Sequence, residues 1–283
     1  MYASKGPVVE EWADRRFFRP LGWRLANALL PTRISADAVT LASLVLGVLA
    51  GHLFWYRSAW VNASGVLLFI LSDVLDSVDG QLARLRGTST RMGRVLDGLA
   101  DSVRFVSLYG HLAARLYVTH WHWAGVALAL AALFSHAYQA AAADFIRQAY
   151  LRFAVGEGDE LDVDEDAPIG SGASLWERIS SWIYGDYTRR QAWLFPRTTA
   201  LARAYSGREV PESLRRSWAE RQRWVVQGCA WIAQNIRFLL LALTAVPHWP
   251  AAYCWIVVGP LNLVLVVLIL AHEREPKVYA QLA

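Results

Sequence analysis

Long apolar stretches alternate with shorter polar connections along most of this chain of 283 residues. A membrane-spanning helix needs about 20 mostly apolar residues to cross a hydrocarbon core of about 30 Å. Six stretches approach this length, and they are residues 36–56, 59–79, 92–118, 121–145, 224–246 and 251–272. The second, third and fifth carry charges, but each keeps a long apolar remainder on one side. The pattern predicts an all-α integral membrane protein with six transmembrane helices.

The segment before the first span, residues 1–35, mixes large apolar side chains with arginines. The apolar positions recur at roughly helical spacing, and they are Trp12, Phe17, Phe18, Leu21, Trp23, Leu25 and Leu29. This pattern is typical of an amphipathic helix that lies in the membrane interface. The alternative is an ordinary solvent-facing helix that packs on the bundle.

A long polar insertion, residues 153–223, separates the fourth span from the fifth. It opens with an acidic run, which we interpret as a solvated loop, and then becomes rich in arginine and tryptophan. Its second half predicts one or two amphipathic helices on the cytoplasmic surface, where arginines can meet anionic headgroups. The expected organisation is therefore a juxtamembrane segment over 1–35, a membrane domain over 36–152 and 224–272, the insertion, and a tail over 273–283.

Composition supports a membrane protein and excludes several other classes. Hydrophobic residues make up 55% of the chain and charged residues only 18%, whereas about a quarter of the residues in a typical soluble domain are charged. These values exclude collagen, disordered tails and disulfide scaffolds. Cys229 and Cys254 lie in apolar stretches and are interpreted as small buried hydrophobes. We attribute the net charge of +4 to membrane topology and contact with membrane lipids, and expect no nucleic-acid partner.

Arginines gather on alternate connections between the predicted spans. They are Arg15, Arg16, Arg19, Arg24 and Arg33 before the first span, and Arg84, Arg86, Arg91 and Arg94 between the second and third. The intervening connections are short and nearly uncharged, so the positive-inside rule places the arginine-rich loops and both termini in the cytoplasm. No signal peptide is expected, because the first thirty residues contain no apolar core segment. We predict a bacterial inner-membrane location.

Five aspartates flank the connection between the second and third spans. Asp73, Asp76 and Asp79 recur every three residues, and Asp97 and Asp101 are four residues apart. Residues three or four apart share a helix face, so antiparallel packing would bring these carboxylates together. Charged groups at membrane depth are costly and usually functional. A site made only of oxygen ligands suits Mg²⁺ or Mn²⁺ better than Zn²⁺.

Small residues and Arg84 follow the first acidic pair, and Gly93 lies one helical turn before Asp97. Glycine and alanine allow a bulky ligand to approach the backbone, and an arginine can neutralise phosphate oxygens. The complete pattern is D-x2-D-G-x2-A-R-x8-G-x3-D-x3-D, made here by Asp76, Asp79, Gly80, Ala83, Arg84, Gly93, Asp97 and Asp101. It resembles the signature of the CDP-alcohol phosphotransferase family at every fixed position. We interpret it as a polyphosphate site.

The resemblance implies an activity, cofactors and partners. Members of that family are membrane enzymes, usually homodimers, that transfer a group from a CDP-linked lipid to an alcohol and release CMP. By motif position, Asp76, Asp79, Asp97 and Asp101 are expected to bind two divalent cations, and Asp101 also to act as general base. The residues expected to line the CDP pocket are Gly80, Ala83, Arg84 and Gly93. CDP-diacylglycerol is the expected donor, in phospholipid biosynthesis, with inositol phosphate, glycerol phosphate, serine or another lipid alcohol as the acceptor.

Further positions are candidates for contact with substrate. Residues 35–40 resemble the family's Thr-Pro-Asn-x-x-Thr element, but Ala36 and Asp37 depart from its Pro and Asn. Basic residues near the fourth and fifth spans are candidates for binding an acidic acceptor, and they are Arg147, Arg152, Arg221, Arg223 and Arg237. Asp73 lies one turn outside the motif and either contributes to the site or neutralises an arginine, caps a helix or forms hydrogen bonds. Arg104 is an intramembrane candidate one turn after Asp101.

Two other functions remain open at this stage. An aspartate-rich membrane prenyltransferase also binds diphosphate through metals, but its acidic motifs lie far apart and it lacks the Gly-x-x-Ala-Arg element. A divalent-cation transporter could use the carboxylates as a transport site. The fourth to sixth spans hold only one acidic residue, Asp144, which weighs against transport.

Overall fold

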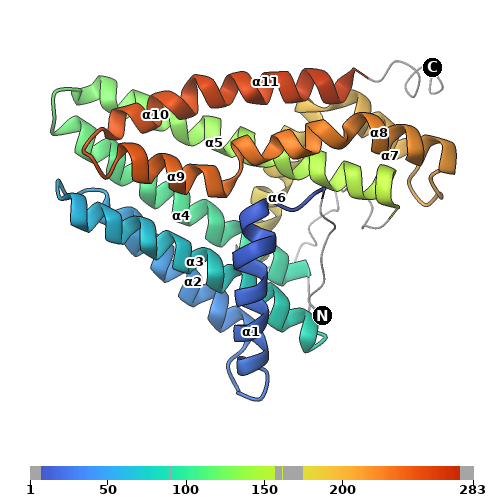
Figure 1. Ribbon diagram of the computed structural model, residues 1–283, viewed down its shortest axis with the longest axis horizontal. Coiled ribbons are helices and arrows are strands. Elements are labelled where there is room, and N and C mark those ends of the chain that lie inside the picture. Colours follow the sequence, from blue (N-terminus) through green and yellow to red (C-terminus); the bar gives the residue numbers. More distant parts are fainter. Residues whose placement is uncertain (1–7, 89–90, 157–160, 162–174, 275–283) are drawn as a thin grey trace. The chain divides into compact units, whose positions relative to one another are not determined.

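The computed structural model describes residues 8–88, 91–156, 161 and 175–274, and its regular elements are all helical (Figure 1). The α-helices are α1 (Arg19–Leu29), α2 (Ala36–Leu53), α3 (Ala59–Leu85), α4 (Arg91–Tyr117), α5 (His122–Tyr150), α6 (Leu175–Leu194), α7 (Pro196–Ala204), α8 (Glu212–Gly228), α9 (Gln234–Thr244), α10 (Pro250–Val258) and α11 (Pro260–Glu273). Three short helical turns are η1 (Asp14–Phe18), η2 (Leu151–Val155) and η3 (Cys229–Ile232). The all-α prediction is confirmed for this part of the chain.

Within the described ranges, five helical runs are long and apolar enough to cross a membrane. They are Ala36–Leu53, Ala59–Leu85, His122–Val155, Glu212–Thr244 and Pro250–Glu273. These runs correspond to five of the six predicted spans. The third predicted span, which forms α4, is not among them, because α4 carries several charged residues along its 27 residues. The structure therefore supports an all-helical integral membrane protein, and the sixth crossing stays a prediction.

The predicted fifth and sixth spans are not single uninterrupted helices. In the fifth, the 3-10 turn η3 separates α8 from α9, and Ala233 has an extended backbone with ψ of 179°. In the sixth, α10 ends at Val258, Gly259 follows it, and α11 begins at Pro260. Proline has no backbone N–H and clashes with the preceding turn, so it interrupts a helix.

The chain divides into two compact units. The first contains Glu10–His136 and Gln234–Pro260, and the second contains Ala137–Ala233 and the residues from Leu261 onward. In the first unit, α2 packs against α3 and α4, α1 crosses α3, and α9 lies beside α3 and α10 (Figure 1). The helices α2, α3 and α4, which carry the aspartate motif, thus belong to one unit.

Small residues allow these helices to approach closely. A Cβ atom added at Gly51 of α2 would lie 2.7 Å from the backbone nitrogen of Leu108 in α4. A Cβ atom at Gly22 of α1 would lie 2.6 Å from the Ser77 hydroxyl of α3. Next to this crossing, Ala26, Val39, Val78 and Leu82 form a buried apolar cluster. Burial of such side chains at short separation stabilises the unit by dispersion and by removing apolar surface from water.

Arg86 fixes the turn between α1 and α2 against the end of α3. Its guanidinium donates hydrogen bonds to the backbone carbonyls of Leu29, Leu30, Thr32 and Ile34. The Ser35 hydroxyl then caps α2 by accepting a hydrogen bond from the Ala38 N–H at 3.1 Å. A serine cap of this kind satisfies one of the free N–H groups at a helix start.

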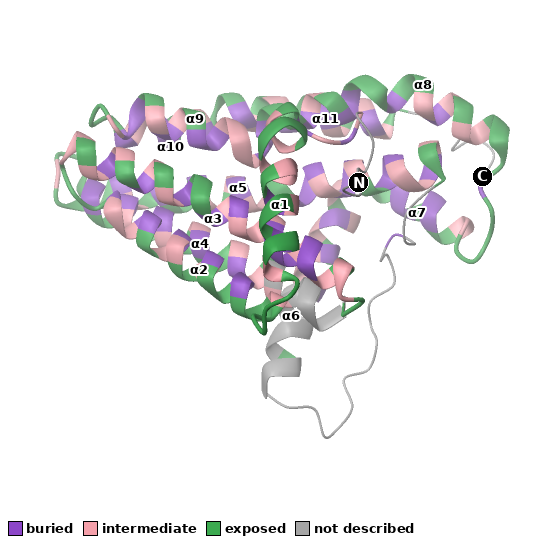
Figure 2. Cartoon of the chain, turned by 60° about the horizontal axis from the view of Figure 1, so that its bottom comes forward, coloured by how far each residue is buried: buried purple, intermediate pink, exposed green. Residues whose placement is uncertain are grey.

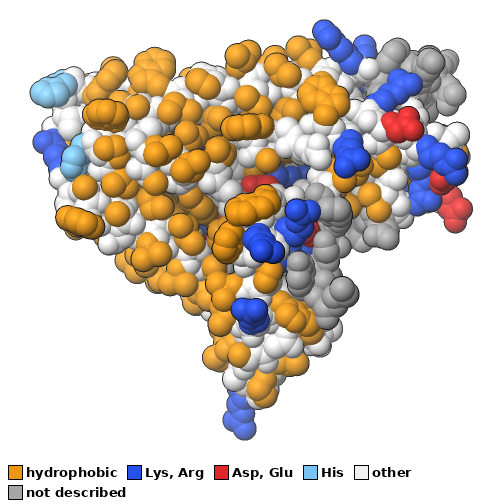
Figure 3. All heavy atoms as spheres, in the orientation of Figure 1, with side chains coloured by type: hydrophobic (Ala, Val, Ile, Leu, Met, Phe, Trp, Pro, Cys, Tyr) orange, Lys and Arg blue, Asp and Glu red, His pale blue; other side chains and the backbone are white. Residues whose placement is uncertain are grey.

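Apolar side chains cover the outer faces of the motif-bearing helices. Leu41, Val45 and Leu49 of α2 follow one another at four-residue spacing and are exposed, as is Leu67 of α3. Exposed and buried residues alternate along these helices (Figure 2), and hydrophobic side chains dominate their visible surface, whereas Lys and Arg side chains lie around α1 (Figure 3). An exposed apolar face of this extent is typical of a surface in contact with lipid.

In the second unit, charged and aromatic side chains tie the helices together. Glu273, at the end of α11, accepts hydrogen bonds from the backbone N–H groups of Arg197 and Thr198 at the start of α7. The Trp218 and His272 rings pack edge to face with centroids 5.7 Å apart. The described part of the predicted insertion contains α6, α7 and the first turns of α8.

Candidate functional site

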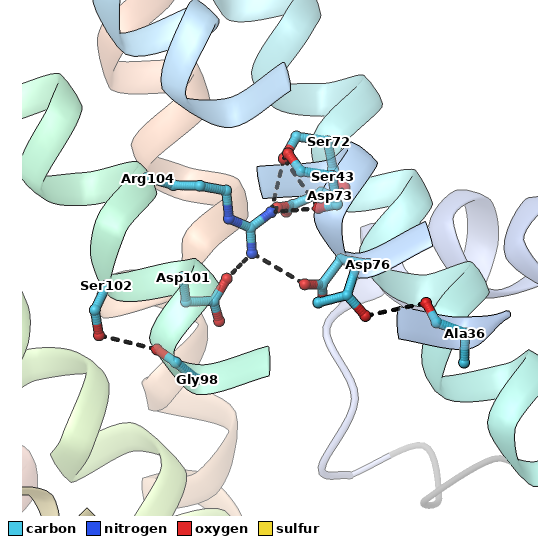
Figure 4. A network of polar contacts seen from close by, with 10 residues as sticks. Ala36, Ser43, Ser72, Asp73, Asp76, Gly98, Asp101, Ser102 and Arg104 are labelled. Carbon is cyan, nitrogen blue, oxygen red and sulfur yellow. Dashed lines mark hydrogen bonds and ion pairs between the residues drawn. The ribbon is translucent and has the colours of Figure 1, made fainter. Parts of the chain in front are cut away.

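Four of the five predicted aspartates have described side chains, and three of them surround one arginine. Asp73 and Asp76 project from α3 and Asp101 from α4, because these positions lie on the faces that the two helices turn toward each other (Figure 4). Arg104 of α4 contacts all three carboxylates. The expected convergence of acidic side chains from the second and third spans is therefore present in the described part of the site.

The Arg104 guanidinium divides its contacts between two sides. Its Nη2 lies 3.0 Å from Asp76 Oδ1 and also forms an ion pair with Asp101. Its Nη1 lies 3.6 Å from Asp73 Oδ1. Only 3% of the Arg104 side chain is exposed, so the charge is buried among the carboxylates that neutralise it. A buried charge is tolerated when it is paired and hydrogen-bonded in this way.

Two serines complete the surroundings of the guanidinium. Arg104 Nη1 donates hydrogen bonds to Ser72 Oγ at 2.8 Å and to Ser43 Oγ at 3.2 Å. These serines also join α2 to α3, since each hydroxyl donates a hydrogen bond to the other's backbone carbonyl. The arginine position is thus set by groups from three helices, α2, α3 and α4.

Asp79 occupies a different environment from its neighbours. The residue is only 6% exposed, and its Oδ2 atom is buried without a hydrogen-bond partner in the described structure. Thr40 of α2, the last residue of the stretch that resembles the family's Thr-Pro-Asn-x-x-Thr element, is a neighbour that can hydrogen-bond to this carboxyl. A buried carboxylate oxygen with no donor is costly, so Asp79 is suited to a ligand that supplies positive charge.

The small residues of the motif leave the backbone of α3 accessible beside Asp79. A Cβ atom added at Gly80 would lie 3.6 Å from Arg84 Nη1, so Arg84 folds back along the glycine. Ala83 is half-buried on the same helix, and Arg84 is exposed. Gly93 and Asp97 belong to the first turns of α4, and their side-chain placements lie outside the described part of the structure.

The donor chemistry fits a hard divalent cation. Asp76, Asp79 and Asp101 supply only carboxylate oxygens, which Mg²⁺ and Mn²⁺ prefer. Among the described side chains, no group of three His, Cys, Asp or Glu residues is arranged as a metal site. Arg104 already contacts Asp76 and Asp101, and the side chain of the predicted ligand Asp97 lies outside the described part of the structure.

The five candidate acceptor arginines are divided between the two units. Arg237 of α9 belongs to the first unit, where it is 2% exposed, and Arg147, Arg152, Arg221 and Arg223 belong to the second. Arg152 Nη2 donates hydrogen bonds to the backbone carbonyls of Tyr205 at 3.2 Å and Arg208 at 2.8 Å. Arg221 and Arg223 are exposed on α8. Arg152 therefore has a structural role, whether or not it also meets an acceptor.

Sequence reasoning did not anticipate the acidic residues that α9 and the N-terminal segment bring together. Asn235 Nδ2 donates hydrogen bonds to Glu11 Oε2 at 2.8 Å and to Asp14 Oδ1 at 3.1 Å. Both carboxylates lie close enough to Asp73 to interact with it electrostatically. The sequence holds no periodic signal for this contact, because more than 220 positions separate the partners. The sequence did identify Asp73 and Arg104 as candidates, but it did not predict their ion pair.

Comparison with known proteins connects this arrangement to a family. Residues 33–152 match the family model for CDP-alcohol phosphatidyltransferase. The chain is 32% identical to a phosphatidylinositol phosphate synthase of Mycobacteroides abscessus over 127 residues, which cover 42% of this chain and 52% of that protein. It is 36% identical to the Mycobacterium marinum phosphatidylinositol phosphate synthase over 111 residues, covering 38% of this chain and 44% of the relative.

A relative with a different acceptor in its name matches over a similar length. The chain is 30% identical over 104 residues to a CDP-diacylglycerol–serine O-phosphatidyltransferase of Helicobacter pylori, covering 37% of this chain and 42% of that protein. The chain thus spans about half the length of the curated relatives it matches. The matched region contains α2, α3 and α4 and all eight motif residues. Over residues 33–152 the chain is therefore similar to the CDP-alcohol phosphatidyltransferase family.

Proposed function

We propose that this protein transfers a phosphatidyl-type group from a CDP-linked lipid to an alcohol acceptor and releases CMP, in phospholipid biosynthesis. The observation that carries the proposal is the convergence of Asp76 of α3 and Asp101 of α4 on Arg104 within the matched region (Figure 4). CDP-diacylglycerol is the proposed donor. The names of the relatives support inositol phosphate and serine as acceptors to test first.

The aspartates of the motif and its other residues have different proposed ligands. Asp76, Asp79, Asp97 and Asp101 are proposed to hold two divalent cations, Mg²⁺ or Mn²⁺, and Asp79 contributes a buried oxygen that has no donor in the described structure. The bound ions would neutralise the diphosphate and stabilise the departing CMP oxygen. Gly80, Ala83, Arg84 and Gly93 are proposed to line the CDP pocket. The missing side chain at Gly80 lets the Arg84 guanidinium lie close to the backbone of α3, where it can neutralise phosphate oxygens.

Asp101 is proposed as the general base. Its side chain is 46% exposed, so an acceptor hydroxyl can reach it, whereas Asp79 is nearly inaccessible. The hydroxyl proton passes to the Asp101 carboxylate as the acceptor oxygen bonds to the phosphorus of the phosphatidyl group. The bond from that phosphorus to the oxygen of CMP breaks, and CMP leaves. A base must lie within hydrogen-bond reach of the proton it removes.

The proposal also includes the oligomeric state of the enzyme, its location and its orientation in the membrane. We place it as a homodimer in a bacterial inner membrane, with six crossings and with the active site and both termini in the cytoplasm. The alternating arginine-rich connections support this orientation. Arg147, Arg152, Arg221, Arg223 and Arg237 are candidates for acceptor binding, of which Arg221 and Arg223 are the most accessible described pair.

The decisive measurement is CMP release by the purified protein from CDP-diacylglycerol with Mg²⁺ or Mn²⁺. Each reaction contains one alcohol from a panel of inositol phosphate, glycerol phosphate, serine and a lipid alcohol. We expect CMP to be released with one acceptor and lost in Asp79→Asn. Asp144→Asn is the matched control, because Asp144 is a carboxylate outside the motif that accepts hydrogen bonds from Gln148 and Tyr187.

Three outcomes would contradict the proposal. If the protein binds no CDP-lipid, the transfer reaction is wrong. If Mn²⁺ crosses vesicle membranes through the protein and no CMP is formed with any acceptor, the carboxylates serve transport instead. Binding of a prenyl diphosphate in place of the CDP-lipid would point to prenyl transfer.

A further inference from the structure

Arg104 does not belong to the eight-residue motif, yet it contacts three acidic side chains. It lies one turn after Asp101 on α4 and contacts Asp73, Asp76 and Asp101 (Figure 4). Two of these three carboxylates are proposed metal ligands. The third, Asp73, lies outside the motif, one turn before Asp76.

The fork of the guanidinium separates motif from non-motif partners. Nη2 points to Asp76 and Asp101, whereas Nη1 points to Asp73 and to the hydroxyls of Ser43 and Ser72. The partners on the Nη1 side can hold the arginine without Asp76 and Asp101. The partners on the Nη2 side are the oxygens that a divalent cation would need.

The fold provides space for this side chain. A Cβ atom added at Gly47 of α2 would lie 2.2 Å from Arg104 Cδ and 2.4 Å from Cγ. The aliphatic part of Arg104 therefore crosses the surface of α2 where the glycine leaves a gap. Because the side chain is 3% exposed, the cation is placed among the carboxylates by packing and not by chance contact at a surface.

We propose that Arg104 is an internal counter-cation of the carboxylate cluster, which competes with divalent cations for Asp76 and Asp101 and is retained by Asp73, Ser43 and Ser72. The inference rests on the proposed function, because it takes Asp76 and Asp101 to be metal ligands. Without a bound cation, close carboxylates repel one another and their burial is costly. Arg104 offsets that repulsion, and it weakens cation binding because both cations need the same oxygens.

A second buried arginine on the same helix shows what a purely structural role looks like. Arg115 of α4 is 2% exposed, as is Arg104. Its Nη1 donates to the backbone carbonyl of Phe54 at 3.1 Å, and its Nη2 lies 3.3 Å from His248 Nδ1. Arg115→Gln is therefore a matched control for loss of a buried guanidinium away from the motif carboxylates.

The test is thermal unfolding of the purified full chain in detergent, first in EDTA and then over a Mn²⁺ titration. In Arg104→Gln we expect the Tm in EDTA to fall and the Mn²⁺ concentration that gives half of the Tm increase to drop by about tenfold. In Arg115→Gln we expect the Tm to fall by the same amount with and without Mn²⁺. An unchanged or higher Mn²⁺ midpoint in Arg104→Gln would overturn the proposal.

Asp73→Asn provides an independent measurement should Arg104→Gln fail to fold. Removing the Asp73 charge leaves Arg104 more dependent on Asp76 and Asp101, so we expect the Mn²⁺ midpoint to rise several-fold, by about threefold to tenfold. A lower midpoint would mean that Asp73 does not retain the arginine, and would overturn the proposal.

Wild-type CMP release separates this inference from the proposed function. If the wild type releases CMP and Arg104→Gln has an unchanged Mn²⁺ midpoint, the inference fails alone. If both midpoints shift as expected but no CMP forms with any acceptor, the inference holds and the proposed reaction fails. If Mn²⁺ does not change the Tm of the wild type, no divalent cation binds in competition with Arg104, and the inference is wrong.

Discussion

Two buried arginines of α4 have different kinds of partner. At the middle of the helix, Arg104 is neutralised by carboxylates from α3 and α4. Toward its end, Arg115 is held by the backbone carbonyl of Phe54 and the imidazole of His248. Both residues are 2% exposed. Burial alone therefore does not distinguish a functional charge from a structural one.

The difference lies in what the partner groups can do when the arginine leaves. A backbone carbonyl has no charge to offer another cation, so a guanidinium bound to it contributes mainly to folding. A carboxylate can exchange one cation for another, so a guanidinium bound to it takes part in ligand equilibria. Arg86, which donates to four backbone carbonyls, belongs with Arg115 in this respect.

The largest expected effect comes from removing the proposed base, Asp101, beside Arg104. In Asp101→Asn we expect turnover to fall by about 10²–10⁴-fold, because the amide cannot accept the acceptor proton. Binding of a CDP-lipid analogue should weaken less, since Asp76 and Asp79 remain. CMP release and equilibrium binding measured on the same preparation check this prediction. Equal losses of binding and turnover would argue against a base role.

Substitution of Arg115, in the last turn of α4, should change stability and not catalysis. Arg115→Gln removes the donor to the Phe54 carbonyl, so we expect the free energy of unfolding to fall by about 1–3 kcal/mol. CMP release per folded molecule should stay at the wild-type level. Thermal unfolding in detergent together with CMP release checks both statements. A loss of turnover in fully folded Arg115→Gln would contradict the distinction between Arg104 and Arg115.

A single added methyl group can test how closely Arg104 is packed. In Gly47→Ala the new Cβ atom would collide with the stem of Arg104, so we expect a loss of about 1–3 kcal/mol in stability. Gly110→Ala of α4 is the control, because a Cβ atom there meets nothing within 4 Å. Thermal unfolding of both variants is the measurement. Equal Tm values for Gly47→Ala and the wild type would show that Arg104 moves aside at little cost.

The smallest expected effect concerns an arginine that the sequence made a candidate for acceptor binding. Arg152 donates to the carbonyls of Tyr205 and Arg208, so Arg152→Gln should lower stability by about 1 kcal/mol. We compare it with Arg223→Gln, which changes an exposed side chain on α8. The KM for the acceptor and the Tm of each variant separate the two roles. A raised KM with an unchanged Tm in Arg152→Gln would assign it to the acceptor instead.

Local patterns in the sequence predicted much of this site because helix periodicity connects spacing to position. Aspartates three or four residues apart had to share a face, and the structure brings Asp76 and Asp101 to one guanidinium. Arg104 and Asp73 were noticed as charges at membrane depth, but their pairing was left open. The pairing depends on how α3 is rotated against α4, and no local pattern encodes that rotation.

The sequence by itself determined the all-helical class, five apolar spans that the structure contains, and the motif that lies in the region matched by the family model, since each follows from composition or from residue spacing. Only the tertiary structure decided that Arg104 and not Arg115 faces the carboxylates, that Asn235 meets Glu11 and Asp14, and that Arg152 binds backbone carbonyls. These contacts join residues that are distant along the chain, and they depend on packing at glycines such as Gly47. Charge identifies which side chains need partners, and packing decides which partners they meet.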